Sequence, residues 1–237
     1  AEMTMSIYPE LKRREEVLGL EVWYTRNRFP SAFCIIPNQT INDPKKRELY
    51  RKFDFRKALS LAINRDEMND LIFSGLGTPQ QMVSLDPNLY DEEVANQYIQ
   101  YDPDEANRLL DELGLNKRNS EGFRTWPDGE DLTITFEHAA IRDWDRFGEL
   151  IVRYLQDVGL DMNYKTYTYG AYKDSLSQGL ADISGFHADL STILRFATGM
   201  GSRYQGWLFG SAWRTWINSG GESGEEPPEW LKESGEM

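Results

Sequence analysis

Residues Asp54–Gln80, DFRKALSLAINRDEMNDLIFSGLGTPQ, contain the pattern of two short helices followed by a glycine-rich turn. Phe55, Leu59 and Ala62 recur at helical spacing, so one face of the first helix is apolar. A second helix is expected over 65–73, immediately before the turn SGLGTP. The stretch contains no catalytic motif, which indicates that it is scaffold and leaves open what the scaffold carries.

Composition describes a globular and strongly acidic chain. Of its 237 residues, 40% are hydrophobic and 13% aromatic, which is enough to bury a sizeable core. The formal net charge of −13 disfavours binding to nucleic-acid phosphates and to anionic membrane surfaces. Cys34 is the only cysteine, so no internal disulfide can form. No signal peptide and no apolar run of about 18 residues is present, so no membrane span is expected.

Further elements are expected on both sides of the opening stretch. A charged surface helix is predicted over 8–18, and strands are predicted over 20–25 and 31–37 because both are rich in β-branched and aromatic residues. Asp43 and Pro44 are the residue types favoured at the cap and the first position of a helix, so another helix should begin there.

The sequence YDPDEANRLLDELGL, at 101–115, predicts a helix capped by Asp102. The stretch 122–138 predicts a β-hairpin, because the PDG triplet at 127–129 has the residues of a tight turn. Three alternating apolar residues should form the buried face of its second strand: Leu132, Ile134 and Phe136.

The second half of the chain alternates helices and strands. A long amphipathic helix is predicted over 142–158, a strand over 159–168, a helix over 171–178 and a short strand over 181–186. Such alternation predicts an α/β fold, with a mixed sheet flanked by helices.

Four segments together resemble the C-terminal lobe of family 5 extracellular solute-binding proteins. These are the peptide-, nickel- and oligosaccharide-binding components of bacterial ABC importers. The similar segments are FRKALSLAINRDEMNDLIFSGLGTP (55–79), YDPDEANRLLDELGL (101–115), GFRTWPDGEDLTITF (122–136) and ELIVRYLQDVGLDM (149–162). They follow the order and spacing of the family, and the resemblance extends over about residues 40–200.

The resemblance implies one lobe of a periplasmic-binding-protein-like II fold. Residues 1–37 are then expected to lie near the hinge, 38–219 to form the ligand-binding lobe, and 220–237 to be an acidic tail leading back towards a second lobe. Family members are longer, so the chain is expected to be an excised lobe. The implied function is non-enzymatic capture of a peptide or oligosaccharide. The complete protein would be a monomer that delivers its ligand to an ABC permease, periplasmic or extracellular, with lipoprotein tethering as one option.

The resemblance also implies a binding residue after the last predicted strand, in ISGFHADLS (183–191). In peptide-binding members a similar strand is followed by an aromatic residue and then by an acid that pairs with the terminal ammonium of the ligand. Phe186 and Asp189 occupy these places. Alternatively, Asp189 caps a following helix. The residues LSTI at 190–193 depart from the acid and proline that follow in many peptide binders, which leaves peptide specificity open.

A second candidate surface is YQGWLFGSAWRTW, at 204–216. Trp207, Trp213 and Trp216 could stack against sugar rings or apolar side chains of a ligand. The alternative is that these aromatics belong to the core or to an interface between lobes, where an excised lobe would expose them.

The sequence gives little support for a metal site, a haem site or catalysis. His138 and His187 are the only histidines, and with one cysteine they give no spacing for zinc or haem, so no cofactor is expected. Carboxylate pairs at 91–92 and 143–145 could serve glycoside hydrolysis, but acids at helix starts are more often caps. We therefore predict a non-enzyme, with a ligand-sensing domain of a regulator or a glycoside-acting enzyme as the alternatives.

Overall fold

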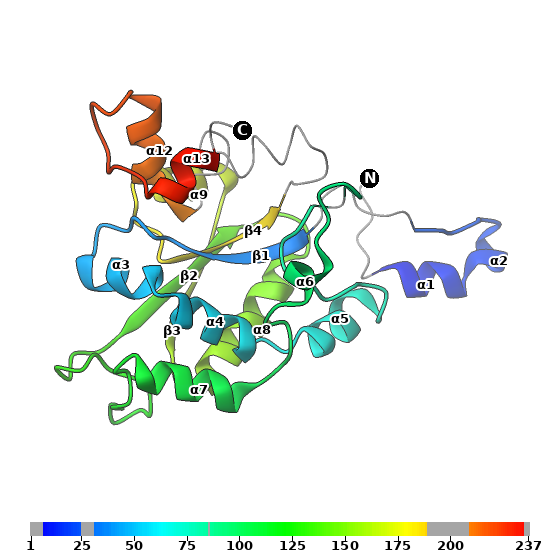
Figure 1. Ribbon diagram of the computed structural model, residues 1–237. Coiled ribbons are helices and arrows are strands. Elements are labelled where there is room, and N and C mark those ends of the chain that lie inside the picture. The colour runs from blue at the N-terminus through cyan, green and yellow to red at the C-terminus, as the bar shows by residue number, and fades with distance from the viewer. Residues whose placement is uncertain (1–6, 25–30, 85, 189–208, 235–237) are drawn as a thin grey trace.

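The computed structural model describes residues 7–24, 31–84, 86–188 and 209–234 (Figure 1). A four-stranded sheet lies at its centre, in the order β1-β4-β2-β3. Strand β2 runs parallel to both β3 and β4, whereas β1 runs antiparallel to β4, so the sheet is mixed as predicted. The strands are β1 (Ser31–Pro37), β2 (Thr133–Ala139), β3 (Asp161–Tyr167) and β4 (Ile183–Ala188).

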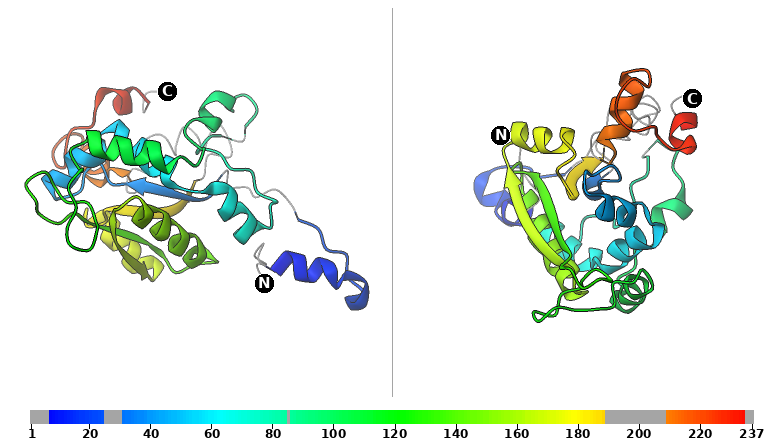
Figure 2. Two further views of the ribbon diagram at one scale, coloured as in Figure 1. Left: turned by 90° about the horizontal axis from the view of Figure 1, so that it is seen from below. Right: turned by 90° about the vertical axis from the view of Figure 1, so that its left-hand side faces the viewer.

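Helices cover both faces of the sheet (Figure 2). Helix α8 packs on β2 and β3 from one side and is itself in contact with α4 and α5. Helix α9 packs on the same two strands from the other side. The described helices are α1 (Tyr8–Arg13), α2 (Glu15–Leu18), α3 (Pro44–Arg51), α4 (Phe53–Ala62), α5 (Arg65–Phe73), α6 (Glu92–Asn96), α7 (Pro103–Glu112), α8 (Trp144–Asp157), α9 (Tyr169–Ser177), α12 (Ser211–Asn218) and α13 (Glu229–Ser234).

Local sequence explains where several helices begin. The side chains of Asp43, Asn64 and Asp102 each accept a hydrogen bond from a backbone N–H in the first turn of α3, α5 and α7, respectively. These bonds satisfy donors that have no partner inside the helix. The predicted helix over 65–73 coincides with α5, and the predicted cap at Asp102 is confirmed.

The core on the α8 side of the sheet is dense and aromatic. The Phe33 ring, from β1, stacks on Phe147 of α8 at a centroid distance of 5.1 Å and meets Phe136 of β2 edge-on. Gly185 of β4 makes room for it, because a Cβ there would lie 2.2 Å from the Phe33 ring. Ile134 and Phe136 are completely buried, as their alternation predicts.

The predicted hairpin over 122–138 is wrong. Its turn exists, with a positive φ of 92° at Gly129, but a single bridge, between Thr125 and Asp131, spans it. The strand after the turn, β2, pairs with β3 and β4 instead. The physical reason is Arg124, which is 1% exposed.

The guanidinium of Arg124 holds the segment before the turn away from the sheet. It donates hydrogen bonds to the carbonyl oxygens of Val158 (2.8 Å) and Leu115 (2.6 Å), and to Oδ1 of Asn107 (2.7 Å). A buried charge is stable only when such partners surround it. The segment is thus fixed between α7 and the end of α8.

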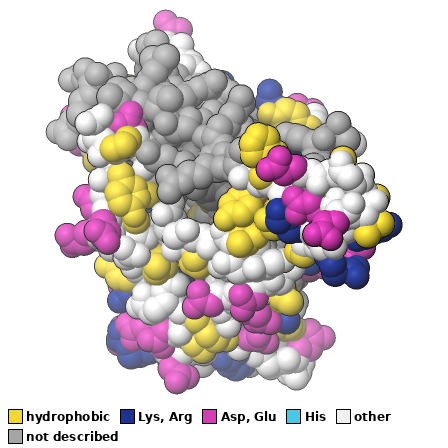
Figure 3. Space-filling view, turned by 90° about the vertical axis from the view of Figure 1, so that its right-hand side faces the viewer, with side chains coloured by type: hydrophobic (Ala, Val, Ile, Leu, Met, Phe, Trp, Pro, Cys, Tyr) yellow, Lys and Arg dark blue, Asp and Glu magenta, His cyan; other side chains and the backbone are white. Residues whose placement is uncertain are grey.

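An N-terminal arm projects from the body of the molecule (Figures 1 and 2). The predicted helix over 8–18 is present as α1 and α2, divided at Arg14, but residues 20–24 of the predicted strand are irregular. Val17 and Trp23 are 84% and 78% exposed. Figure 3 looks from the side of this arm, where hydrophobic side chains lie in separate patches among charged ones. Within the described residues, no helix has the length and hydropathy needed to cross a membrane.

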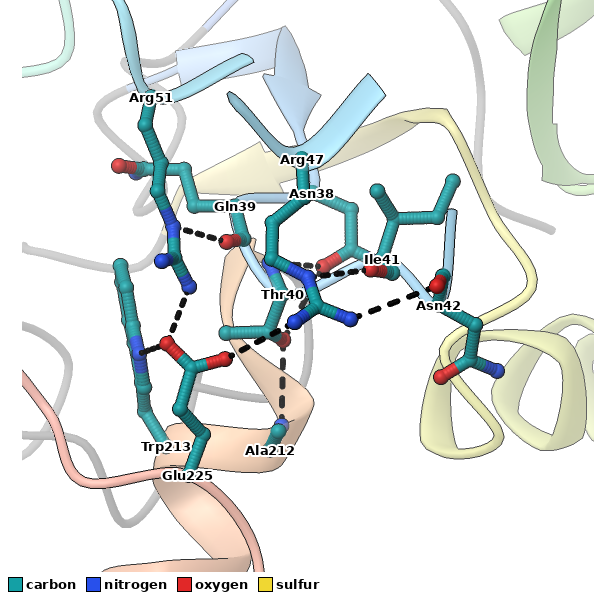
Figure 4. A network of polar contacts seen from close by, with 10 residues as sticks. All are labelled: Asn38, Gln39, Thr40, Ile41, Asn42, Arg47, Arg51, Ala212, Trp213 and Glu225. Atoms are coloured by element: carbon teal, nitrogen blue, oxygen red, sulfur yellow. Dashed lines mark hydrogen bonds and ion pairs between the residues drawn. The ribbon is translucent and has the colours of Figure 1, made fainter. Parts of the chain in front are cut away.

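The acidic tail packs more closely than its composition suggests. The Glu225 carboxylate pairs with Arg51 and Arg47 of α3, and it accepts a hydrogen bond from the Trp213 indole at 3.2 Å (Figure 4). Leu231 of α13 is only 1% exposed. The described part of the tail is therefore packed against the rest of the chain.

Candidate ligand-binding edge of the sheet

The parallel strands β2, β3 and β4 place their carboxyl ends at one edge of the sheet, which we call the carboxyl edge. The start of β1 lies there too, because Ser31 pairs with Ala188. Open α/β sheets bind ligands in the crevice outside the carboxyl ends of their strands. Among the described residues, the segments that leave this edge are the β2–α8 connection and the start of α9.

An aromatic cluster supports the carboxyl edge. The Trp144 ring, at the start of α8, meets Phe33 and Phe186 edge-on, at centroid distances of 5.4 and 5.3 Å. The His187 ring stacks on Phe186 at 4.3 Å. Trp144 and Phe186 are 2% and 5% exposed, whereas His187 is half-buried. Phe186 thus forms a layer beneath the edge, and His187 is the member of the cluster nearer to solvent.

His138 fixes the geometry of β2 at the same edge. Its side chain is fully buried, with Nδ1 2.8 Å from the Ala139 carbonyl oxygen and Nε2 2.8 Å from the Tyr164 hydroxyl. Because a carbonyl oxygen can only accept, Nδ1 carries a proton and donates it to Ala139, while Nε2 lies within hydrogen-bond distance of the Tyr164 hydroxyl. Burial raises the pKa of Tyr164, which keeps this phenol protonated as a donor. The side chain of His138 therefore has a structural role.

Tyr169 and Arg142 add exposed groups to the carboxyl edge. Tyr169 is the first residue of α9, separated from the end of β3 by one residue, and is 46% exposed. Arg142, also exposed, lies in the β2–α8 connection with a left-handed φ of 51°, a conformation that costs about 1 kcal/mol for a residue with a side chain. Tyr169 is not among the site residues predicted from the sequence. An aromatic residue directly after a predicted strand was the signal that could have identified it.

The described part of the predicted tryptophan surface, Trp213 and Trp216, does not lie at the carboxyl edge. Trp213 is 3% exposed, with the Arg51 guanidinium 5.2 Å above its ring, and Trp216 is half-buried with Lys232 at 5.7 Å. Helix α12, which carries both, is bonded to the residues that follow β1, through Ala212 N–H and the Thr40 hydroxyl. That position is at the opposite edge, beside the start of β4.

The structure therefore separates the predicted site residues. Phe186 belongs to the carboxyl edge, while Trp213 and Trp216 belong to the opposite one, where Trp213 is part of a core as the alternative interpretation held. Asp189 and Trp207 lie outside the described residues.

A small cleft lies between α9 and α12. It has a volume of about 160 Å³ and a lining of hydroxyl, amide and glycine residues that includes Thr40, Ser177 and Thr215. Pockets that enclose small-molecule ligands usually span roughly 300–1,000 Å³. The cleft is thus too small for a peptide or an oligosaccharide. Within the described residues, no group of histidine, cysteine and acidic side chains is arranged to hold a metal ion.

Solved structures with similar folds are binding proteins. An oligopeptide-binding protein, OppA, matches 98% of this chain with 26% identity and a TM-score of 0.80, over 39% of its own length. A periplasmic oligopeptide-binding protein of Thermotoga maritima, solved with mannohexaose bound, matches 81% of this chain with 25% identity and a TM-score of 0.63. The match covers 37% of that protein.

Proteins of similar sequence are binding proteins as well. The oligopeptide-binding protein OppA of Lactococcus lactis is 28% identical over 160 residues, which cover 65% of this chain and 26% of that protein. A probable ABC transporter-binding protein of Deinococcus radiodurans is 36% identical over 92 residues, 38% of this chain and 15% of that protein. The chain thus spans about a quarter or less of these relatives. The family model for bacterial extracellular solute-binding proteins, family 5 Middle, matches residues 10–193. The chain belongs to family 5 of the bacterial extracellular solute-binding proteins.

Proposed function

We propose that the chain is the part of an ABC-importer binding protein that holds one side of the ligand. The observation that carries this proposal is the carboxyl edge of the sheet, where three parallel strands end together above an aromatic layer. Family membership supports the same conclusion, and it agrees with the prediction of a non-enzyme.

Capture would proceed by closure of two lobes around the solute. This chain supplies a rigid wall, because Trp144 and His138 lock the strand ends through packing and hydrogen bonds. The remaining length of the relatives would supply the opposite wall, and hinge motion would bring the walls together. The closed form would then dock on a membrane permease, outside the cytoplasmic membrane.

Peptides and oligosaccharides are the proposed ligand classes. The Lactococcus relative is named an oligopeptide-binding protein, and the Thermotoga structure contains mannohexaose. The Tyr169 ring and hydroxyl suit either class, because an aromatic face packs on sugar rings and apolar side chains alike. Asp189 and Trp207 stay predictions as further ligand contacts, Asp189 as the acceptor for an ammonium or for sugar hydroxyls.

Mass spectrometry of the solute that co-purifies with the longer protein tests this proposal. A bound peptide or oligosaccharide is expected, and calorimetry with the same compound should give a Kd of about 1 μM or tighter. The 237-residue chain alone should bind it at least about a hundredfold more weakly, because half of the contacts are absent. Turnover of the compound during incubation would contradict the non-enzymatic assignment.

A further inference from the structure

The face of the sheet under α9 contains a buried acid that the proposed capture does not use. The Glu137 side chain, at the centre of β2, belongs to a residue that is 2% exposed, and its Oε1 has no hydrogen-bond partner among the described residues. An ionised carboxylate in such a place is costly, because it has lost water without gaining enough donors. The protonated acid is far less costly to bury.

The groups around Glu137 come from three elements. Register places Lys165 of β3 and Ser184 of β4 directly beside it, and α9 lies above it with Ser175 and Tyr172. Lys165 is exposed, so its charge is largely screened by water. The Tyr172 hydroxyl donates to the Gly185 carbonyl at 3.0 Å and is occupied there. Neither Lys165 nor Tyr172 fully compensates the negative charge that Glu137 would carry when ionised.

Asp182, just before β4, is an acid whose charge acts on Glu137, and its own carboxylate has several partners. Its carboxylate pairs with Lys46 at 2.9 Å and accepts from the Tyr50 hydroxyl at 3.1 Å and from the Thr135 backbone N–H at 2.8 Å. The negative charge of Asp182 further disfavours ionisation of Glu137.

These surroundings shift the pKa of the Glu137 carboxyl. Burial raises the pKa of the Glu137 carboxyl above its ordinary value, and the charge of Asp182 raises it further. The Ser175 hydroxyl and the Lys165 ammonium oppose this shift only in part. The packed state of α9 thus binds the Glu137 proton more tightly than a state in which α9 has moved away and water reaches the carboxyl.

We propose that Glu137 makes the docking of α9 on the sheet dependent on pH. Helix α9 packs over the protonated acid. When the proton leaves to solvent, the carboxylate needs water, which it obtains only if α9 loosens. Because the folded-state pKa is raised, this contribution to stability is complete below the ordinary pKa and is lost as pH rises through the raised one. The carboxyl edge is affected as well, because α9 begins with Tyr169. The inference does not depend on the proposed function.

Hydrogen exchange of the 237-residue chain tests whether the docking of α9 depends on pH. The exchange rates of backbone amides in α9 and α8 would be measured at about pH 5 and about pH 7.5. Division by the intrinsic exchange rates then gives the opening equilibrium of each helix. Opening of α9 should increase severalfold over this range, because the packed state binds the Glu137 proton more tightly than the opened state does. Opening of α8 should not follow it. Glu137→Gln, which keeps the shape without a titrating proton, should abolish the increase.

Glu149→Gln is the matched control, because Glu149 is an exposed acid on α8. It should leave the α9 response as in the unaltered chain. A pH response that survives in Glu137→Gln would overturn the proposal. So would an increase shared equally by α8 and α9, which would indicate global loosening. If Glu137→Gln failed to fold, the comparison of α9 with α8 in the unaltered chain would still decide, since equal responses would refute the mechanism.

Discussion

The face of the sheet under α8 and the face under α9 are built by alternate residues of the same strands. On β2, Phe136 and His138 point towards α8, where rings from three elements interlock, while Glu137 points towards α9. On β4, Gly185 serves the first face and Ser184 the second. Strand alternation thus lets one sheet have a dense, apolar face and a polar face with an uncompensated acid. We expect the first to resist any change of volume and the second to respond to solution conditions.

Gly185→Ala should have the largest effect, because it adds a methyl group where the Phe33 ring lies 2.2 Å from the Cβ position. Overpacking of this kind costs about 2–3 kcal/mol of unfolding free energy, measurable by urea denaturation. Gly170→Ala, in α9, is the control: nothing lies within 4 Å of its Cβ position, and stability should stay within about 0.5 kcal/mol. Equal costs at both positions would show that the clash with the Phe33 ring is not the cause of the loss.

Gly148→Ala tests the contact of α8 with β3. A Cβ there would lie 2.4 Å from the Tyr164 hydroxyl, so the phenol must move and its bond to His138 must weaken. A cost of about 1–2 kcal/mol is expected. In a Tyr164→Phe background the clashing oxygen is absent, and the cost of Gly148→Ala should fall to about half or less. Simple additivity in this double-mutant cycle would show that the hydroxyl is not the cause.

The Glu225 network provides a smaller effect outside both faces. Glu225→Gln weakens pairing with Arg47 and Arg51, and because all three groups are partly exposed the loss should be about 1 kcal/mol or less. The loss should shrink in high salt. Glu222→Gln, an exposed acid nearby, should change nothing measurable. Thermal unfolding at low and high salt provides the comparison, and a salt-independent loss would speak against the ion pairs.

Features set by nearby residues were predictable from the sequence, as the caps at Asp43 and Asp102 illustrate. Features set by distant partners were not. The hairpin prediction failed because Arg124 bonds to Val158, 34 residues away. The burial of Phe186 depends on Trp144, which α8 brings to the carboxyl edge.

The separation of the tryptophans from that edge has a similar origin. It depends on a hydrogen bond from the Gln39 backbone N–H to the Phe209 carbonyl, which attaches α12 beside the start of β4. Periodicity within α12 predicts an amphipathic helix but contains no information about the edge it joins. Composition likewise missed the packing of the tail, because the partners of Glu225, Arg47 and Arg51, are distant in the sequence.

Hydrogen exchange of the longer protein, with and without its co-purified solute, tests the central claim most directly. If the solute binds at the carboxyl edge, protection should increase in the β2–α8 connection (140–143) and at Tyr169. The opposite edge, at 38–42 and 211–215, should not change. Protection that appeared only at the opposite edge, or at neither edge while the solute was shown to be bound, would contradict the assignment of the carboxyl edge as the ligand wall.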